Sequence, residues 1–191
     1  MTSHKKMTSH KNKLVAESKR RLTRASLPKA TRPHIPGYGL PKSKKGLLPW
    51  RWAEDRLKKS RQFWIATTRP DGQPHVMIVW ALWMHGLLYF STGKESRKAR
   101  NLGQNPKCTM CTDNAAEGVI LEGAVETERN VERIRELIDL YEKKYKYKLG
   151  KMGERMLALE DPVFFLRPKL GFGLWEKKFD TSATRWLFNS A

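Results

Sequence analysis

The stretch from Ser91 to Asn101, which reads Ser-Thr-Gly-Lys-Glu-Ser-Arg-Lys-Ala-Arg-Asn, carries the strongest structural signal in the sequence. It follows an apolar run that predicts a strand, and it continues through small residues into a helix predicted at residues 96–103. Ser96 suits the N-cap of that helix, while Arg97 and Lys98 put two cations in its first turn. Cations oppose the helix dipole there, and the unpaired N–H groups favour an anion. The turn therefore predicts a phosphate site, with a solvated basic turn as the alternative.

Hairpins precede this stretch, and further short strands follow it. The Arg-Pro-Asp-Gly turn at residues 69–72 and the turn His85-Gly86 separate three predicted strands. Helices are predicted at residues 49–57 and from the N-cap Asn130 to Gly150. The predicted strands are residues 63–68, 73–84, 87–91, 107–112, 118–127, 163–167, 171–175 and 185–188. Adjacent hairpins with few helices predict a mainly β, antiparallel α+β domain, built as a small β-barrel with helices packed outside.

The 191 residues carry 38 Lys+Arg and 19 Asp+Glu, and the resulting net charge of +19 is unevenly distributed. Residues 1–45 hold 13 Lys+Arg and a single acid, whereas residues 46–191 hold 25 against 18. The first segment has few large apolar residues and several prolines, so we expect a disordered basic extension over 1–45 and one ordered domain over 49–188. It also has the composition of an organelle transit peptide, although a solvated arm is favoured. Because the opening five residues recur from Met7, Met1 and Met7 are both candidate start sites.

The composition argues against two classes of protein. The longest apolar run, residues 76–84, is about half the length of a membrane-spanning helix, so we expect a cytoplasmic protein with no membrane segment. The only cysteines, Cys108 and Cys111, are too few for a disulfide-stapled scaffold. Their CxxC spacing is used by zinc and redox sites, but on a strand this offset places the two thiols on opposite faces. We therefore predict ordinary sheet residues here and no metal site.

Five segments occur in an order that identifies a family. They are the Pro-Asp-Gly turn, the strand Pro-His-Val-Met-Ile-Val-Trp at 74–80, the strand Leu-Tyr-Phe-Ser-Thr at 88–92, the turn Ser-Arg-Lys-Ala at 96–99, and Asn105-Pro106. In this order the sequence resembles the pyridoxamine 5′-phosphate oxidase-like family of flavin-binding split β-barrels, which are antiparallel and Greek-key-like. Residues 118–126 are similar to the family's next strand, and residues 184–188 to the end of its flavin- or deazaflavin-dependent branch. The resemblance covers about residues 50–188.

The resemblance implies a homodimer that binds FMN or the deazaflavin coenzyme F420 at its interface. It also implies an oxidoreductase that transfers hydride to or from a small organic substrate, with chemistry supplied by the cofactor, and no catalytic residue is identified. The implied cofactor-binding residues are His75, Val76, Met77, Ile78, Val79 and Trp80 at the ring, Ser91 and Thr92 at the ribityl-phosphate chain, Ser96, Arg97 and Lys98 at the phosphate, and Trp175 and Arg185 from the second subunit.

The chain departs from true pyridoxamine phosphate oxidases in two places. Gly118 stands where those enzymes have Gln, and their Arg/His-rich C-terminal segment, which grips the substrate phosphate, is absent. The resemblance therefore favours the branch that uses FMN or F420, and it argues against a vitamin B6 substrate.

Two other functions remain open on the sequence. The cations of residues 1–45 would let a catalytically idle barrel bind nucleic acid or another polyanion without sequence preference. A cofactor carrier with no substrate of its own is the other alternative. Single residues are also ambiguous, since His75 would face either the cofactor or water, and Trp80 and Trp83 belong in the core or at the dimer interface.

Overall fold

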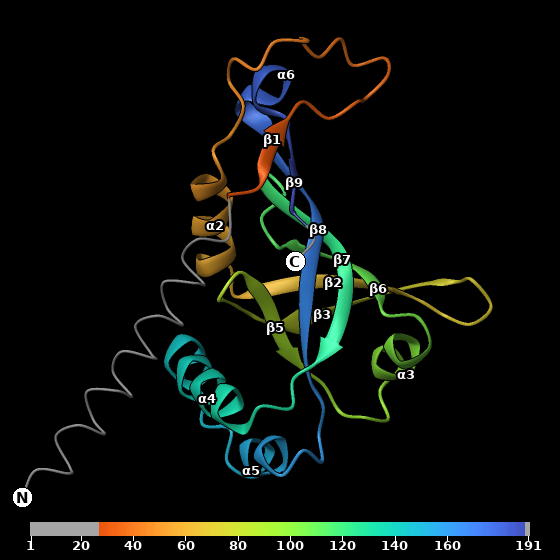
Figure 1. The fold of residues 1–191 in the computed structure, drawn as a ribbon, viewed down its shortest axis with the longest axis vertical. Coiled ribbons are helices and arrows are strands. Elements are labelled where there is room, and N and C mark those ends of the chain that lie inside the picture. Colours follow the sequence, from red (N-terminus) through yellow and green to blue (C-terminus); the bar gives the residue numbers. More distant parts are fainter. Residues whose placement is uncertain (1–26, 190–191) are drawn as a thin grey trace, which may run out of the picture.

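All the strands of the described chain belong to one antiparallel β-sheet. The computed structural model describes residues 27–189. The strands follow the order β1-β9-β8-β7-β6-β2-β3, and β5 pairs with both β8 and the short β4 (Figure 1). Their bounds are β1 Lys29–Thr31, β2 Gln62–Thr68, β3 Pro74–Trp80, β4 Leu82–Met84, β5 Leu87–Ser91, β6 Lys107–Thr112, β7 Glu117–Thr127, β8 Val163–Trp175 and β9 Thr184–Leu187. The pairings are all antiparallel, as predicted.

The helices gather at the two ends of this sheet and along its sides. Figure 1 places α4 and α5 at one end of the long axis and α6 with β1 at the other, while α2 and α3 lie on opposite sides of the sheet. Their bounds are α2 Trp50–Lys59, α3 Arg97–Gln104, α4 Val131–Tyr145, α5 Lys151–Leu157 and α6 Phe179–Ser182, with a 3₁₀ turn at Glu176–Lys178. Within residues 27–189, none of the helices has the length and hydropathy needed to cross a membrane.

Alternating burial along the strands builds two hydrophobic clusters. In β2, Phe63 and Ile65 are fully buried while Trp64 between them is exposed, because successive side chains point to opposite faces. The larger cluster fills the barrel and includes Trp186 of β9 and Leu57 of α2. The second cluster packs α4 and α5 against the sheet, and it consists of Leu82, Met84, Tyr89, Ile134, Leu137, Leu149, Met156, Val163 and Phe165.

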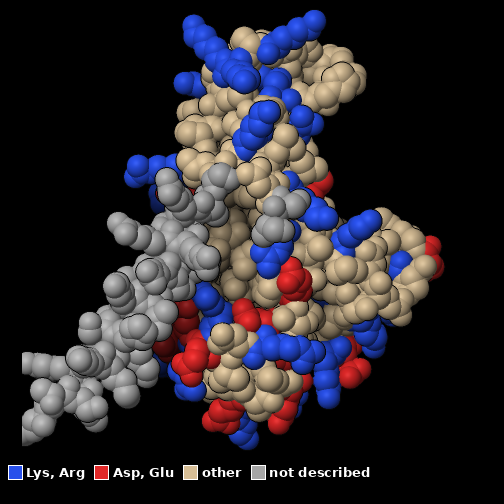
Figure 2. Space-filling view, viewed as in Figure 1, with Lys and Arg blue, Asp and Glu red and all other residues tan. Residues whose placement is uncertain are grey.

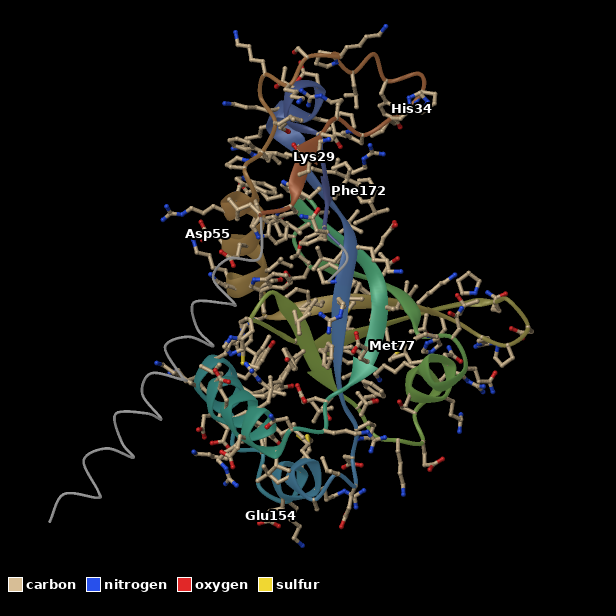
Figure 3. The ribbon with its side chains drawn as sticks, in the orientation of Figure 1. Lys29, His34, Asp55, Met77, Glu154 and Phe172 are labelled. Atoms are coloured by element: carbon tan, nitrogen blue, oxygen red, sulfur yellow. The ribbon has the colours of Figure 1, made fainter. Side chains whose placement is uncertain are left out.

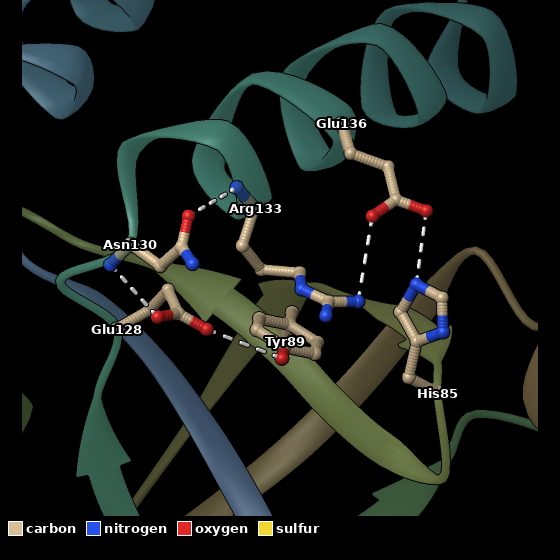
Figure 4. Close-up of polar contacts among 6 residues, drawn as sticks. All are labelled: His85, Tyr89, Glu128, Asn130, Arg133 and Glu136. Carbon is tan, nitrogen blue, oxygen red and sulfur yellow. Dashed lines mark hydrogen bonds and ion pairs between the residues drawn. The ribbon is translucent and has the colours of Figure 1, made fainter. Parts of the chain in front are cut away.

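Polar contacts also fix the start of α4 against the β4–β5 hairpin (Figure 4). Glu128 accepts hydrogen bonds from the Asn130 backbone N–H at 2.9 Å and from the Tyr89 hydroxyl at 3.4 Å. Glu136, two turns along, pairs with His85 at 2.9 Å and Arg133 at 3.4 Å. Burial, followed by the charge of Glu128, raises the pKa of Tyr89 to about 12. The hydroxyl therefore stays protonated and acts as a donor at neutral pH.

Four predicted elements have different bounds in the structure. The strand predicted at residues 73–84 is interrupted at Ala81, whose N–H donates to the Tyr145 hydroxyl at 2.9 Å and whose carbonyl accepts from Lys144 Nζ at 3.0 Å. The helix predicted to reach Gly150 ends at Tyr145, because Lys146 takes a left-handed conformation with φ 55°, and α5 begins after Gly150. The two strands predicted at residues 163–175 form one strand, β8, with a register shift opposite Glu122 and Gly123.

The prediction that residues 1–45 are disordered is wrong for residues 27–45, and residues 1–26 lie outside the described part. Strand β1 pairs with β9, and Arg32 donates to four carbonyl groups, at 2.7 Å and 2.8 Å to Thr181 and Ala183 and at 3.0 Å to both Ser43 and Lys45. The segment is ordered by backbone pairing and by one guanidinium group. Composition, which reports apolar burial, does not detect either interaction.

Candidate functional site

The predicted phosphate turn forms as a capped helix start. Ser96 accepts a hydrogen bond from the Ala99 backbone N–H at 3.2 Å, which confirms it as the N-cap of α3. The Thr92 hydroxyl lies 3.1 Å from the Ser96 hydroxyl, so the strand end and the helix start are joined by side chains. Ser91 uses its hydroxyl proton differently, donating at 2.9 Å to the Pro162 carbonyl. Thr92 and Ser96 therefore sit at the turn, while Ser91 offers only its lone pairs.

The first turn of α3 carries positive charge that no acid neutralises. Neither Arg97 nor Lys98 has a carboxylate partner among the described residues. Arg97 is exposed and Lys98 is half-buried. Burial lowers the pKa of Lys98, as expected for a cation that is partly desolvated without a counter-ion. A bound phosphate would supply that counter-ion and would also complement the helix dipole.

A buried polar link joins α3 to the start of β3. Asn101 Nδ2 donates to Thr67 Oγ1 at 3.0 Å, and both side chains are almost fully buried. Thr67 Oγ1 in turn donates to the His75 carbonyl at 3.3 Å and lies 3.5 Å from His75 Nδ1. The structure thereby brings His75 to the same part of the molecule as the α3 turn. The sequence analysis missed Thr67 and Asn101, although both are polar residues at positions where the apolar pattern points inward.

Strand β3 presents one unpaired backbone edge and several exposed apolar side chains. It ends the sheet and pairs with β2 alone among the described strands. Val76, Met77 and Ile78 are about half exposed, while Val79 is buried in the core, so Val79 can reach a ligand only through its backbone. Trp80 stacks on Tyr145 with ring centroids 4.5 Å apart, and it remains 37% exposed. Figure 3 shows Met77 in the middle of the molecule, away from the end that holds α4 and α5 and from the end that holds α6.

Trp175 and Arg185 lie apart from the other predicted residues. Arg185 is on β9, and four strands of the sheet path separate β9 from β3. Its Nε donates to Thr31 Oγ1 at 3.1 Å, and Thr31 donates to the Arg185 carbonyl at 3.2 Å. Trp175 ends β8, with the Lys178 ammonium group 5.0 Å from its ring centroid. These two residues do not join the α3 turn along the sheet of a single chain.

A cavity of about 500 Å³ is lined by residues of strands β2, β6, β7 and β8 and by Pro74 at the start of β3. Its lining includes Thr67, Pro74, Lys107, Thr109, Glu122 and Lys169. None of the residues predicted from the resemblance lines it, but it shares Thr67 with the contact to His75. Its volume lies within the usual range of small-molecule sites. The space next to the start of β3 is therefore large enough for part of a cofactor or substrate.

The two cysteines behave as ordinary sheet residues. Cys108 is buried in the main core, while Cys111 lies half-buried on the other face of β6, which confirms the predicted orientation. Burial raises the pKa of the Cys108 thiol to about 12, so it stays protonated and unreactive at neutral pH. Residues 27–189 contain no group of three or more His, Cys, Asp or Glu suited to hold a metal ion.

Comparison with solved structures finds the same fold in proteins of different character. An F420 reductase is 22% identical, with 62% of this chain and 94% of that chain covered and a TM-score of 0.51. A conserved hypothetical protein from Mycobacterium tuberculosis is 23% identical, with 69% and 86% covered and a TM-score of 0.59. The heme storage protein HutZ from Vibrio cholerae is 16% identical, with 61% and 87% covered and a TM-score of 0.50. At these identities the likeness establishes the fold and leaves the function open.

The family follows from the sequence match. No curated protein matches the chain. The family model for pyridoxamine 5′-phosphate oxidase matches residues 52–164, which run from α2 through β2, β3 and the α3 turn to the first residues of β8. This match covers more than half of the chain and includes the segments that carry the resemblance. The chain therefore belongs to the pyridoxamine 5′-phosphate oxidase-like family, and its antiparallel sheet with packed helices is that family's split β-barrel.

Proposed function

We propose that the protein is an oxidoreductase that binds FMN or F420 and transfers hydride to or from a small organic molecule. The observation that carries the proposal is the α3 turn, where Arg97 and Lys98 have no acidic partner within residues 27–189 and Lys98 is partly desolvated. Both cofactors carry a phosphate on a ribityl chain, so the same turn suits either. The family match supports this class of cofactor, and one structural neighbour is an F420 reductase.

The residues present fit such a cofactor. At the turn, the backbone N–H groups of α3 and the Arg97 guanidinium would donate to phosphate oxygens, while Lys98 would add a point charge. The Thr92 hydroxyl, held by Ser96, would bind the adjoining chain. The free edge of β3 would give backbone donors and acceptors to the polar edge of a ring system. Thr67 of β2 connects this strand to α3, since it bonds both the His75 carbonyl and Asn101. The bound group would supply the hydride chemistry, and the protein would supply position and exclusion of water.

A homodimer would complete the site. Trp64, Val76 and Ile78 are 43–50% exposed, and Ile78 lies directly opposite Trp64 in the register of β2 and β3. These side chains share one sheet face, where a second copy would remove them from water. Trp175 and Arg185, which are remote from β3 along the sheet of their own chain, would then be available to the partner's cofactor.

The test compares cofactor binding by two double variants. Replacing Arg97 and Lys98 with Ala should raise the Kd for the preferred cofactor by roughly 100-fold or more, since each charged hydrogen-bond partner contributes about 1.5–3 kcal/mol. The matched control, Arg135→Ala with Lys143→Ala, removes two exposed cations from α4 and should leave the Kd unchanged. Fluorescence titration with FMN and with F420 measures both. Equal affinity in the two variants would refute the phosphate assignment.

The identity of the cofactor can be read from an absorption spectrum. Protein purified from a host that lacks F420 should be yellow if it retains FMN, or colourless and able to take up added F420. Turnover with the bound cofactor then separates an oxidoreductase from a cofactor carrier, which would bind with equal affinity and reduce or oxidise nothing.

A further inference from the structure

Two distant chain segments build one end of the molecule. We name residues 27–46 and 175–187 together the basic end. Strands β1 and β9 pair within it, and Arg32 donates both to Ser43 and Lys45 and to Thr181 and Ala183. The Tyr38 ring meets Phe179 edge-on with centroids 5.7 Å apart. A side chain at Gly46 would come within 2.7 Å of the Thr181 carbonyl oxygen, so the segments are in close contact.

The basic end holds positive charge that its surroundings do not neutralise. It contains eight Lys+Arg against two acids, Glu176 and Asp180. None of its cations forms an ion pair with a carboxylate in the described residues, and the contacts of Arg32 are with uncharged carbonyl groups. Figure 2 shows blue side chains over tan surface at this end, with red confined to the rest of the face. Lys29 and His34 are labelled there in Figure 3, at the opposite end from Glu154.

The shape of the charge favours an extended polyanion over a small ion. Lys42, Lys44 and Lys45 project from the loop after β1, whereas Lys177 and Lys178 come from the 3₁₀ turn, and all five are exposed. Cations spread over two segments suit a chain of phosphates that contacts several of them in turn. Tyr38 lies among them and is 66% exposed, which offers a ring on which an unpaired base can stack.

An anionic membrane is a poorer match to this surface. Peripheral membrane contacts usually combine cations with a continuous apolar face on an amphipathic helix. Among the described residues, the large apolar side chains that the basic end exposes are Leu27 and Tyr38. Leu27 precedes β1 and Tyr38 lies in a loop, so neither is on a helix. We infer that the basic end binds the phosphate backbone of single-stranded nucleic acid, independently of the cofactor site at α3.

The test measures the salt dependence of binding with the full chain. Fluorescence anisotropy of a fluorescein-labelled single-stranded DNA oligonucleotide gives Kd over a series of salt concentrations. The triple variant Lys42→Ala, Lys44→Ala, Lys45→Ala should bind more weakly. The negative slope of log K against log salt should also become shallower by about 2, since each phosphate contact contributes about 0.7 to its magnitude. The control Arg135→Ala, Lys143→Ala, Lys151→Ala removes the same charge from exposed positions on α4 and α5 and should retain the wild-type slope.

A second variant tests the other segment. Lys177→Ala with Lys178→Ala should make the negative slope shallower by about 1.4 through the same mechanism. Because every variant keeps residues 1–26, the contribution of that segment cancels in the comparison. Retained FMN or F420 binding in the triple variant separates this inference from the proposed function, and it also shows that this variant is folded.

Three outcomes would overturn the inference. Wild-type protein that fails to bind the oligonucleotide at low salt excludes the site. Equal losses of oligonucleotide affinity in the basic-end and control variants would mean that binding depends on the net charge of the protein and is not localised to the basic end. Binding to phosphatidylserine vesicles without binding to the oligonucleotide would assign the surface to a membrane.

Discussion

The two ends of the molecule contain similar numbers of cations but very different numbers of acids. Residues 128–161, which hold α4 and α5 and are named here the helical end, have nine Lys+Arg and eight Asp+Glu. Three of these nine cations, Arg133, Lys148 and Arg155, form ion pairs with acids in the described residues. The basic end has eight Lys+Arg and two acids, and none of its cations is paired with a carboxylate in the described residues.

The difference shows that the number of cations alone does not locate an anion site. Cations that are matched by neighbouring acids connect helices and loops, and they present little net field to a ligand. Cations without such partners remain available for an external anion. The α3 turn belongs to the second class on a smaller scale, because Arg97 and Lys98 have no acidic partner in the part of the chain that the structure describes and are adjacent, which suits one phosphate.

The largest expected effect on stability comes from disrupting the pairing of β7 with β8, the two long strands that connect the two ends. Strands β7 and β8 pair from Glu117 opposite Trp175 to Thr127 opposite Phe164, and their register shifts at Gly123. A Cβ atom at Gly123 would overlap the Arg167 carbonyl oxygen. Gly123→Ala should therefore destabilise the protein by about 3 kcal/mol, as overpacking against the backbone does. Urea denaturation measures the free energy of unfolding.

The matched control for this variant is Gly103→Ala. Gly103 is exposed on α3, and a Cβ atom there meets nothing within 4 Å. Alanine should stabilise that helix by about 0.5–1 kcal/mol, because glycine loses more conformational freedom on folding. If Gly123→Ala were as stable as wild type, β7 and β8 would not approach each other as closely as the structure has them.

A smaller effect is expected from removing the guanidinium group that holds the basic end together. Arg32→Ala leaves four carbonyl groups without their donor and should cost about 2 kcal/mol, since several of these groups are reached by water. Hydrogen exchange should accelerate in residues 28–46 and 179–185, while α4 and α5 keep their protection. Arg32→Lys should restore only part of this protection, because an ammonium group cannot span the two pairs of carbonyls. Uniform acceleration over the whole chain would contradict the local role.

Local sequence signals predicted the elements whose determinants are close together in the chain. The cap at Ser96, the hairpin turns and the strand predicted at residues 63–68 are all confirmed, because each depends on residues within a few positions of one another. The resemblance identified the family on the same local segments. The fold class and the capped turn at α3 could therefore be predicted before the structure.

Contacts between remote residues were beyond the sequence analysis. Strand β1 is three residues long and is ordered by β9, some 150 positions later, so neither hydrophobic periodicity nor composition marks it. The break at Ala81 depends in the same way on the Tyr145 hydroxyl. The Thr67–Asn101 bond is a third case, since a polar residue at an inward position shows that a partner is needed but does not identify it.

The smallest expected effect is a change in pH dependence at the helical end. Arg155 donates to Asp161 at 2.7 Å and 3.0 Å, and these hydrogen bonds lower the pKa of the Asp161 carboxyl more than desolvation raises it. Because the folded-state pKa is below the unfolded value of about 3.9, the pair stabilises the fold above that value and the contribution is lost as pH falls through the folded pKa. Asp161→Asn should therefore lower stability at neutral pH and flatten its decline in acid.

The control is Asp180→Asn, which removes an exposed carboxylate at the basic end that has no ion pair in the described residues. Urea midpoints measured from neutral to acid pH compare the two variants. Equal acid profiles for the two variants would mean that ion pairing at the helical end does not distinguish it from the basic end.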